Sequence, residues 1–193
     1  MKRLLLIFIL TISFNTLTKA NDITDFQIEG MSLGDSALEF FTEEEINKNI
    51  RINAYEGSDG KFYDAGLNNA NYEIYDLVAL VFKKNDPKYI IYSISGMIFF
   101  DNDSKACNEK YKEIVLDIEV FFDDHEKNIK KNVKHNQDKS GKSFYNGTSF
   151  IHKTRSGADI ACYTWSKEMD ISDYTSVSID TADFGYWLDS YYN

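Results

Sequence analysis

The stretch YEIYDLVALVFKKNDPKYIIYSISGMIFF, residues 72–100, decides the fold. It holds two runs rich in Ile, Val, Tyr and Phe, at 72–83 and 88–100, separated by the turn sequence Lys84-Asn85-Asp86-Pro87. β-Branched and aromatic runs on both sides of such a turn predict a hairpin of two strands. The second run is apolar on both faces, which is typical of a strand in the centre of a sheet.

A long helix is predicted directly after this hairpin, over about 104–123. Apolar side chains recur there every three or four residues, at Cys107, Tyr111, Ile114, Ile118, Phe121 and Phe122. This is the spacing that places side chains on one face of a helix. Ile129 and Val133 continue the pattern, which predicts a second helical piece to about 135.

The remaining elements are shorter. A polar loop over 136–148 precedes three predicted strands, at about 148–154, 159–167 and 174–180, and a last helix follows Thr181. The N-terminal part predicts a strand at Phe26–Glu29, helices at 35–41 and 43–50, and a brief edge strand at Lys61–Asp64. The fold class expected is therefore α+β: a mostly antiparallel sheet of about five strands, one long helix packed on one face, and short helices at the termini.

Residues 1–20 read as a secretory signal peptide, with a basic start, an apolar run from Leu4 to Phe14 and Ala20 at the end. Residues 21–193 are then a single globular α+β domain, periplasmic or secreted. The leader holds three basic residues and no acidic one, so its removal changes the net charge from −10 to −13. That charge argues against nucleic acid as a partner. Asn21 replaces the cysteine of a lipoprotein, and no membrane anchor is expected.

Cys107 and Cys162 are the two cysteines. In an exported protein they predict a disulfide, with a reactive thiol at Cys107 as the alternative. If the bond forms, Cys162 faces the long helix, and the alternation along a strand points Tyr163 and Trp165 to the opposite face. That face is either covered by the N-terminal helices or displays an aromatic surface, which would make Tyr163 and Trp165 a candidate binding face.

No catalytic, metal or cofactor motif is found, and His125, His135 and His152 lack the spacing of paired metal ligands. The expected function is an exported, non-enzymatic binding or accessory domain with an envelope or extracellular protein as partner. Two alternatives stay open. One is a small hydrolase that uses Asp, Glu and either His125 or His152, and the other is a carrier of a cationic or apolar small ligand.

Several motifs resemble a group of small exported bacterial proteins of unknown function. The opening FQIEGMSLGDS at 26–36 is similar to their I-x-G-M-S-[IL]-G-D-S pattern, and FTEEEI at 41–46 follows as it does there. The segments KSGKS at 139–143, ACYTWSKEM at 161–169 and VSIDT at 177–181 also resemble that group. More distantly, the chain is similar to the fold of β-lactamase-inhibitor proteins and a small outer-membrane assembly lipoprotein. Those are protein-binding modules, and the resemblance implies no activity and no site residues.

Overall fold

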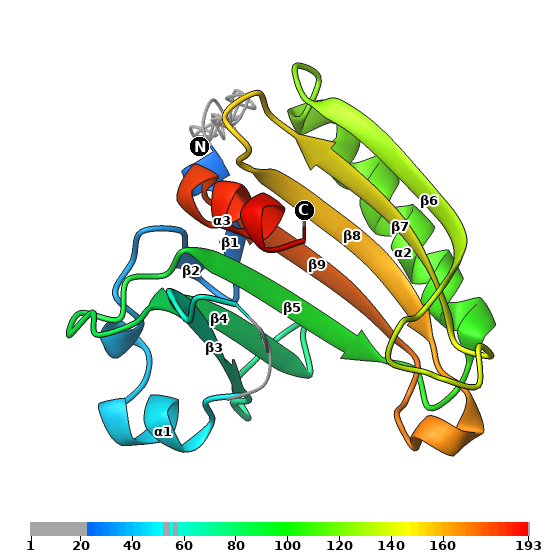
Figure 1. Cartoon of the computed structure of the whole chain (residues 1–193), viewed down its shortest axis with the longest axis horizontal. Coiled ribbons are helices and arrows are strands. Elements are labelled where there is room, and N and C mark those ends of the chain that lie inside the picture. The colour runs from blue at the N-terminus through cyan, green and yellow to red at the C-terminus, as the bar shows by residue number, and fades with distance from the viewer. Residues whose placement is uncertain (1–22, 52–54, 56–57, 193) are drawn as a thin grey trace, which may run out of the picture.

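The computed structural model describes residues 23–51, 55 and 58–192. The predicted signal peptide, 1–20, lies outside the described residues. The main sheet has seven antiparallel strands in the order β3–β4–β5–β9–β8–β7–β6, and a separate two-stranded sheet pairs β1 with β2 (Figure 1). The strands are β1 Gln27–Ile28, β2 Met31–Ser32, β3 Phe62–Leu67, β4 Leu77–Lys83, β5 Ser93–Phe99, β6 Glu126–Lys134, β7 Phe144–Ile151, β8 Gly157–Thr164 and β9 Tyr174–Asp180.

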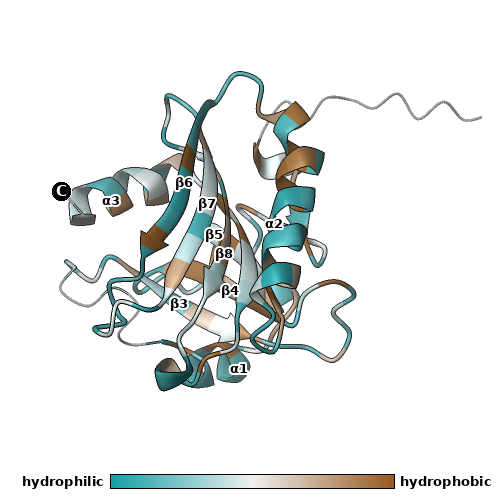
Figure 2. Cartoon of the chain, turned by 90° about the vertical axis from the view of Figure 1, so that its right-hand side faces the viewer, coloured by the Kyte–Doolittle hydropathy of each residue, from teal (hydrophilic) through white to brown (hydrophobic). Residues whose placement is uncertain are grey.

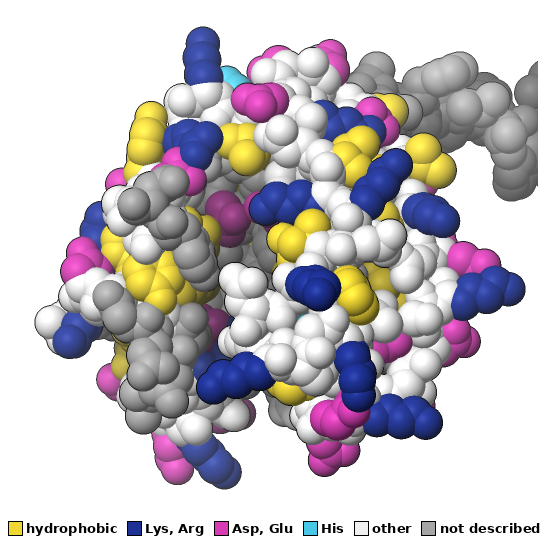
Figure 3. All heavy atoms as spheres, turned by 45° about the vertical axis from the view of Figure 1, so that its right-hand side comes forward, with side chains coloured by type: hydrophobic (Ala, Val, Ile, Leu, Met, Phe, Trp, Pro, Cys, Tyr) yellow, Lys and Arg dark blue, Asp and Glu magenta, His cyan; other side chains and the backbone are white. Residues whose placement is uncertain are grey.

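Within the described residues, three α-helices accompany the sheet: α1 Glu43–Lys48, α2 Ser104–Ile118 and α3 Ala182–Tyr192. A 3-10 turn, Glu119–Phe121, extends α2, and further 3-10 turns lie at Ile23–Asp25, Ala37–Glu39 and Lys167–Met169. A capping box opens α1: the Thr42 hydroxyl accepts from the Glu45 amide, and the Glu45 carboxylate accepts from the Thr42 amide. Figure 2 shows α2 and α3 on opposite sides of the sheet. The face of the molecule seen in Figure 3 is hollowed near its middle.

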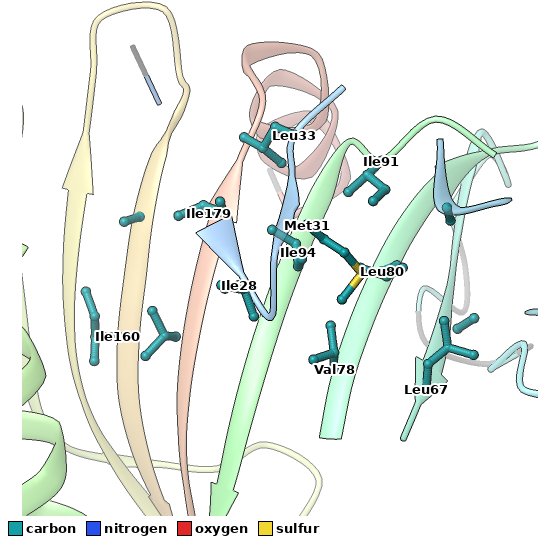
Figure 4. Close-up of a cluster of buried hydrophobic side chains, with 14 of the residues drawn as sticks. Ile28, Met31, Leu33, Leu67, Val78, Leu80, Ile91, Ile94, Ile160 and Ile179 are labelled. Atoms are coloured by element: carbon teal, nitrogen blue, oxygen red, sulfur yellow. The ribbon is translucent and has the colours of Figure 1, made fainter. Parts of the chain in front are cut away.

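The core fills the face of the sheet that α2 covers. The N-terminal segment shares this face, because Ile28, Met31 and Leu33 pack with Leu80 of β4 and Ile94 of β5 (Figure 4). Successive side chains of a strand point to opposite faces of the sheet. The residues between those of the core therefore lie on the second face, and this second face carries the candidate site.

The predicted fold class is wrong. The structure has seven strands in one antiparallel sheet and two more in a second sheet, whereas an α+β fold with a sheet of about five strands was expected. Two strands account for most of the difference. β3 is a full strand of six residues beside β4, and β6 is an additional edge strand of nine residues.

β6 corrects the predicted helix over 124–135. Ile129 and Val133 are four residues apart, which suggests one face of a helix, but a register shift lies between Lys130 and Val133. Ile129 pairs with Thr148 and Val133 with Tyr145, so the bulge sends the two apolar side chains to opposite faces of the sheet. A bulged edge strand thus imitates the helical spacing.

Other boundaries also differ from the prediction. The strand expected at 148–154 begins four residues earlier, at Phe144, because it pairs with both β6 and β8. The run 88–100 becomes regular only from Ser93, while Gly34 and Ala37 of the N-terminal segment form hydrogen bonds to the Ile91 and Tyr89 carbonyls. Contacts with distant segments, which a local pattern does not contain, set these limits.

The predicted disulfide is confirmed. It joins Cys107, in the first turn of α2, to Cys162 in β8, and both residues are fully buried. Its closed loop spans 55 positions of the chain. The bond is compatible with an oxidising, exported location.

Among the described residues, no helix combines the length and the apolar character needed to cross a membrane.

Candidate functional site

Small side chains line the middle of the sheet face opposite α2. They come from five neighbouring strands, in register with one another: Ala79, Ser95, Ser176, Ser178, Ala161, Gly147 and Ser149. We call this set the trough. An antiparallel sheet commonly has one face on the core and one polar face in water. On this face the side chains are short, except for Met97 of β5, which pairs with Ser176, so they leave space above the sheet.

An aromatic row borders one end of the trough. Phe99, Tyr174, Tyr163 and Tyr145 are paired in register across β5, β9, β8 and β7. The ring centroids of Tyr163 and Tyr174 are 4.9 Å apart, and those of Tyr145 and Tyr163 are 5.5 Å apart. Phe99 is 39% exposed, and burial raises the pKa of Tyr174 to about 12, so this phenol stays neutral. The row is an uncharged aromatic border with accessible edges.

A cavity of about 260 Å³ lies at the other end, between the sheet and α3. Phe184 and Leu188 of α3 form one wall, and Val81 of the sheet forms part of the other. Phe184 and Trp187 anchor the helix by packing against Phe62. Among the described residues, the helix that covers the trough is α3, and it lies at this end, where Arg51 and Tyr55 also line the cavity.

Two aspartates, Asp159 and Asp180, line this cavity together with Ser93. Asp180 of β9 pairs with Gly157, and Asp159 of β8 pairs with Ser178, so the carboxyl groups are diagonal neighbours on the same face. Burial and the nearby Asp159 charge raise the pKa of Asp180 to about 7. The Oδ1 atom of Asp180 is enclosed and has no hydrogen-bond partner among the described residues.

Asp159 is exposed and accepts a hydrogen bond from Ser149 Oγ. The surrounding protein partly desolvates this carboxylate, which raises the pKa of Asp159. The hydrogen bond from Ser149 lowers the pKa and offsets part of the rise. The pair therefore concentrates negative charge in a confined place. Figure 3 shows acidic side-chain atoms deep in the hollow, with basic side chains beside it.

The predicted binding-face residues both lie at the aromatic end. Tyr163 belongs to the aromatic row, while Trp165 follows β8 and is only 8% exposed. The Trp165 ring lies 4.3 Å from His135, and its Nε1 has no hydrogen-bond partner in the part of the chain that the structure describes. The N-terminal segment packs on the opposite face of the sheet, so it does not cover Tyr163.

The structure brings His125 and His152 together, away from the cavity lining. Their ring centroids are 5.2 Å apart, and His125 packs against Phe122. His125 Nδ1 lies 2.7 Å from an Asp124 carboxylate oxygen. Neither histidine is among the described residues that line the cavity with Asp159 and Asp180. Within the described residues, no group of three His, Cys, Asp or Glu side chains is placed to hold a metal ion.

The sequence reasoning missed Asp159, Asp180 and the serines of the trough. A signal was present: in Ser176-Val177-Ser178-Ile179-Asp180, polar and apolar residues alternate, which is the pattern of a strand with one polar face. That pattern alone predicts a solvated face. The pairing of β9 with β5 and β8 is what aligns these residues with Ser93, Ser95 and Asp159.

Compared with known proteins, the chain matches no family model, no curated protein and no solved structure.

Proposed function

We propose that this protein is an exported, non-enzymatic binding domain whose trough receives a segment of an envelope or extracellular protein. In this proposal residues 1–20 are removed, and residues 21–193 act in the periplasm or outside the cell. The disulfide fits an oxidising compartment. The resemblance of the opening 26–36 to small exported bacterial proteins also fits this location.

One observation carries the proposal: a floor of small side chains lies between an aromatic row and the α3 cavity. Aromatic residues are enriched at protein interfaces, where their rings give contact area with little loss of conformational entropy. Small residues between such anchors let the backbone of a partner approach the sheet closely. The trough thus has the shape of a receptor for side chains and backbone from another chain.

The shape of the cavity favours a protein segment over a free small ligand. The cavity has about 260 Å³, close to the lower limit of the roughly 300–1,000 Å³ of small-molecule sites, and it continues along the trough floor, because Ala79, Ser95 and Ser178 also line it. A volume of this size accepts one large side chain while the rest of the segment follows the floor. Asp159 and Asp180 disfavour an anionic partner such as nucleic acid.

The hydrolase alternative required a pocket that joins His125 or His152 with carboxylates. His125 packs against Phe122 and His152 lies beside His125, and the described lining of the α3 cavity contains neither ring. A binding function needs no such group. It uses the volume, the aromatic border and the charge that the face provides.

Filling the trough is expected to abolish partner binding. Ser178 lies on the floor and shares a 2.7 Å hydrogen bond with Ser95, and a Ser178→Tyr side chain would occupy the space above it. The tagged mature chain captures its partner from an extract of the source organism's envelope, and quantitative mass spectrometry measures the recovery. We expect the Ser178→Tyr variant to lose at least nine-tenths of the recovered partner.

Two controls separate volume from other effects. Ser178→Ala removes the hydroxyl but adds no bulk, and Leu116→Tyr adds a ring on the exposed side of α2. Both should recover the partner as the unmodified chain does, and all variants should show the same thermal midpoint within a few degrees. Undiminished recovery by a folded Ser178→Tyr variant would refute the assignment of binding to the trough.

A further inference from the structure

We propose that the cavity beneath α3 binds one organic cation, the ammonium or guanidinium group of a Lys or Arg side chain in the partner segment. This inference rests on the proposed function and names the chemistry that the trough recognises. The site consists of the Asp159 and Asp180 carboxylates, the Ser93 hydroxyl, and the apolar walls formed by Phe184 and Leu188.

The unpartnered oxygen of Asp180 is the first argument. Its Oδ1 is enclosed and meets no hydrogen-bond donor among the described residues, while Ser93 donates to the same carboxyl group. An enclosed carboxylate oxygen without a donor costs free energy in the unbound protein. An N–H of a bound cation would supply the missing donor at the place where the cavity offers room for it.

The charges around the cavity are the second argument. Arg51 is paired with Asp64, and its Nε lies 3.1 Å from the Asp64 Oδ1. Arg155 is paired with Asp189 of α3. Both arginines therefore already have a carboxylate of their own.

This leaves Asp159 and Asp180 facing each other across β8 and β9. Lys130 of β6 also interacts electrostatically with Asp159 and lowers the pKa of its carboxyl group. Lys130 is exposed, and one solvated cation cannot neutralise both carboxylates. The cavity consequently keeps a negative charge that a single ligand cation can balance.

The walls are the third argument. Phe184, Leu188 and Val81 provide apolar surface beside the acids, and Tyr55 adds an aromatic ring. Lys and Arg side chains bury an aliphatic stem along apolar surface and hold the charge at its end. A metal ion would need three or more suitable ligands, and the described residues offer no such group.

Binding of the cation should depend on pH in a defined direction. The bound cation favours ionised Asp180, whose pKa in the free protein is raised to about 7. Besides Asp180, the ionisable groups that line this space are Asp159, Asp64, Arg51 and Tyr55, with Arg155 and Asp189 on the α3 side. Because the arginines stay charged and paired, Asp180 and Asp159 determine the response, and affinity falls as the pH drops below about 7.

The test uses small probes on the full mature chain labelled with ¹⁵N. The probes are N-acetyl-lysine methylamide and N-acetyl-arginine methylamide, with N-acetyl-glutamine methylamide as the neutral control. Amide shifts measured by NMR should report binding at Asp159, Asp180 and Phe184. We expect one or both cationic probes to bind at pH 8. Their binding should be at least tenfold weaker at pH 5.5, and the neutral probe should give no saturable shift.

Asp180→Asn preserves the shape of the side chain and should lower the affinity for the cationic probe at least tenfold at pH 8. Asp117→Asn, on the exposed side of α2, removes the same charge elsewhere and should leave the affinity unchanged. Absence of binding by both cationic probes, or equal binding to the Asp180→Asn variant, would overturn the inference.

The folding of the variant has its own readout. An acid whose pKa rises from its ordinary 3.8 to about 7 on folding makes the protein less stable as the pH rises through that interval. The Asp180→Asn variant should therefore unfold at a higher urea concentration than the unmodified chain at pH 8. If the probes bind while the trough variant Ser178→Tyr still captures the partner, the cation site stands and the proposed function fails.

Discussion

Replacing Cys107 and Cys162 together by alanine is expected to lower the free energy of unfolding by about 4 kcal/mol. The bond closes a loop of 55 positions, and in the chain-entropy model a loop of that length restricts the unfolded chain by this amount. Urea unfolding followed by tryptophan fluorescence measures the difference. The bond lies in the core between α2 and β8, so its loss loosens the helix that covers the apolar face.

Reduction of the unmodified chain is the matched control. Unfolding in the presence of a reductant should shift the urea midpoint by a similar amount, whereas the double variant should not respond to the reductant. A double variant as stable as the oxidised protein would show that packing alone holds α2 on the sheet.

Replacing Phe150 by alanine is expected to cost about 3–5 kcal/mol, the usual range for a buried phenylalanine. Phe150 of β7 is 1% exposed, and its ring stacks on Phe122 with centroids 5.2 Å apart. Phe122 stacks in turn on Phe26 of the N-terminal segment, at 5.1 Å. The three rings connect β7, the turn that follows α2 and the segment around Phe26, so a cavity at Phe150 weakens the packing of all three.

Phe99→Ala is the control for this second experiment. Phe99 belongs to the aromatic row, is 39% exposed and contacts Tyr174 at an edge, so its truncation should cost only about 1 kcal/mol. Urea unfolding at one pH compares the two variants. Equal losses would contradict the distinction between an apolar core face and an accessible trough face.

The sequence predicted the parts of the fold that rest on dense local patterns. The hairpin of β4 and β5, the start of α2 and the disulfide were all anticipated, since apolar periodicity and the two cysteines are visible in the chain itself. The strand count was not. β6 is an edge strand that carries Lys127, Lys130, Lys131 and Lys134. Such charges and a bulge prevent an edge strand from pairing with another chain, and they also hide the alternating pattern by which a strand is predicted.

The candidate site was less accessible to prediction than the fold. Tyr163 could be assigned to a face because Cys162 fixed the orientation of its strand. Asp159 and Asp180 belong to different strands, and only the register of β8 with β9 makes them neighbours. A carboxylate pair of this kind has no sequence spacing of its own, so it becomes visible once the sheet is assembled.

The most direct test of the trough is site-specific photocrosslinking in the source organism. A photoreactive phenylalanine derivative in place of Phe99, which is 39% exposed at the border of the trough, is compared with the same residue at Leu116, which is 70% exposed on α2. We predict that position 99 yields a covalent adduct with one exported protein and that position 116 yields none. The absence of an adduct from position 99 in a folded variant, or the same adduct from position 116, would contradict a binding function of the trough.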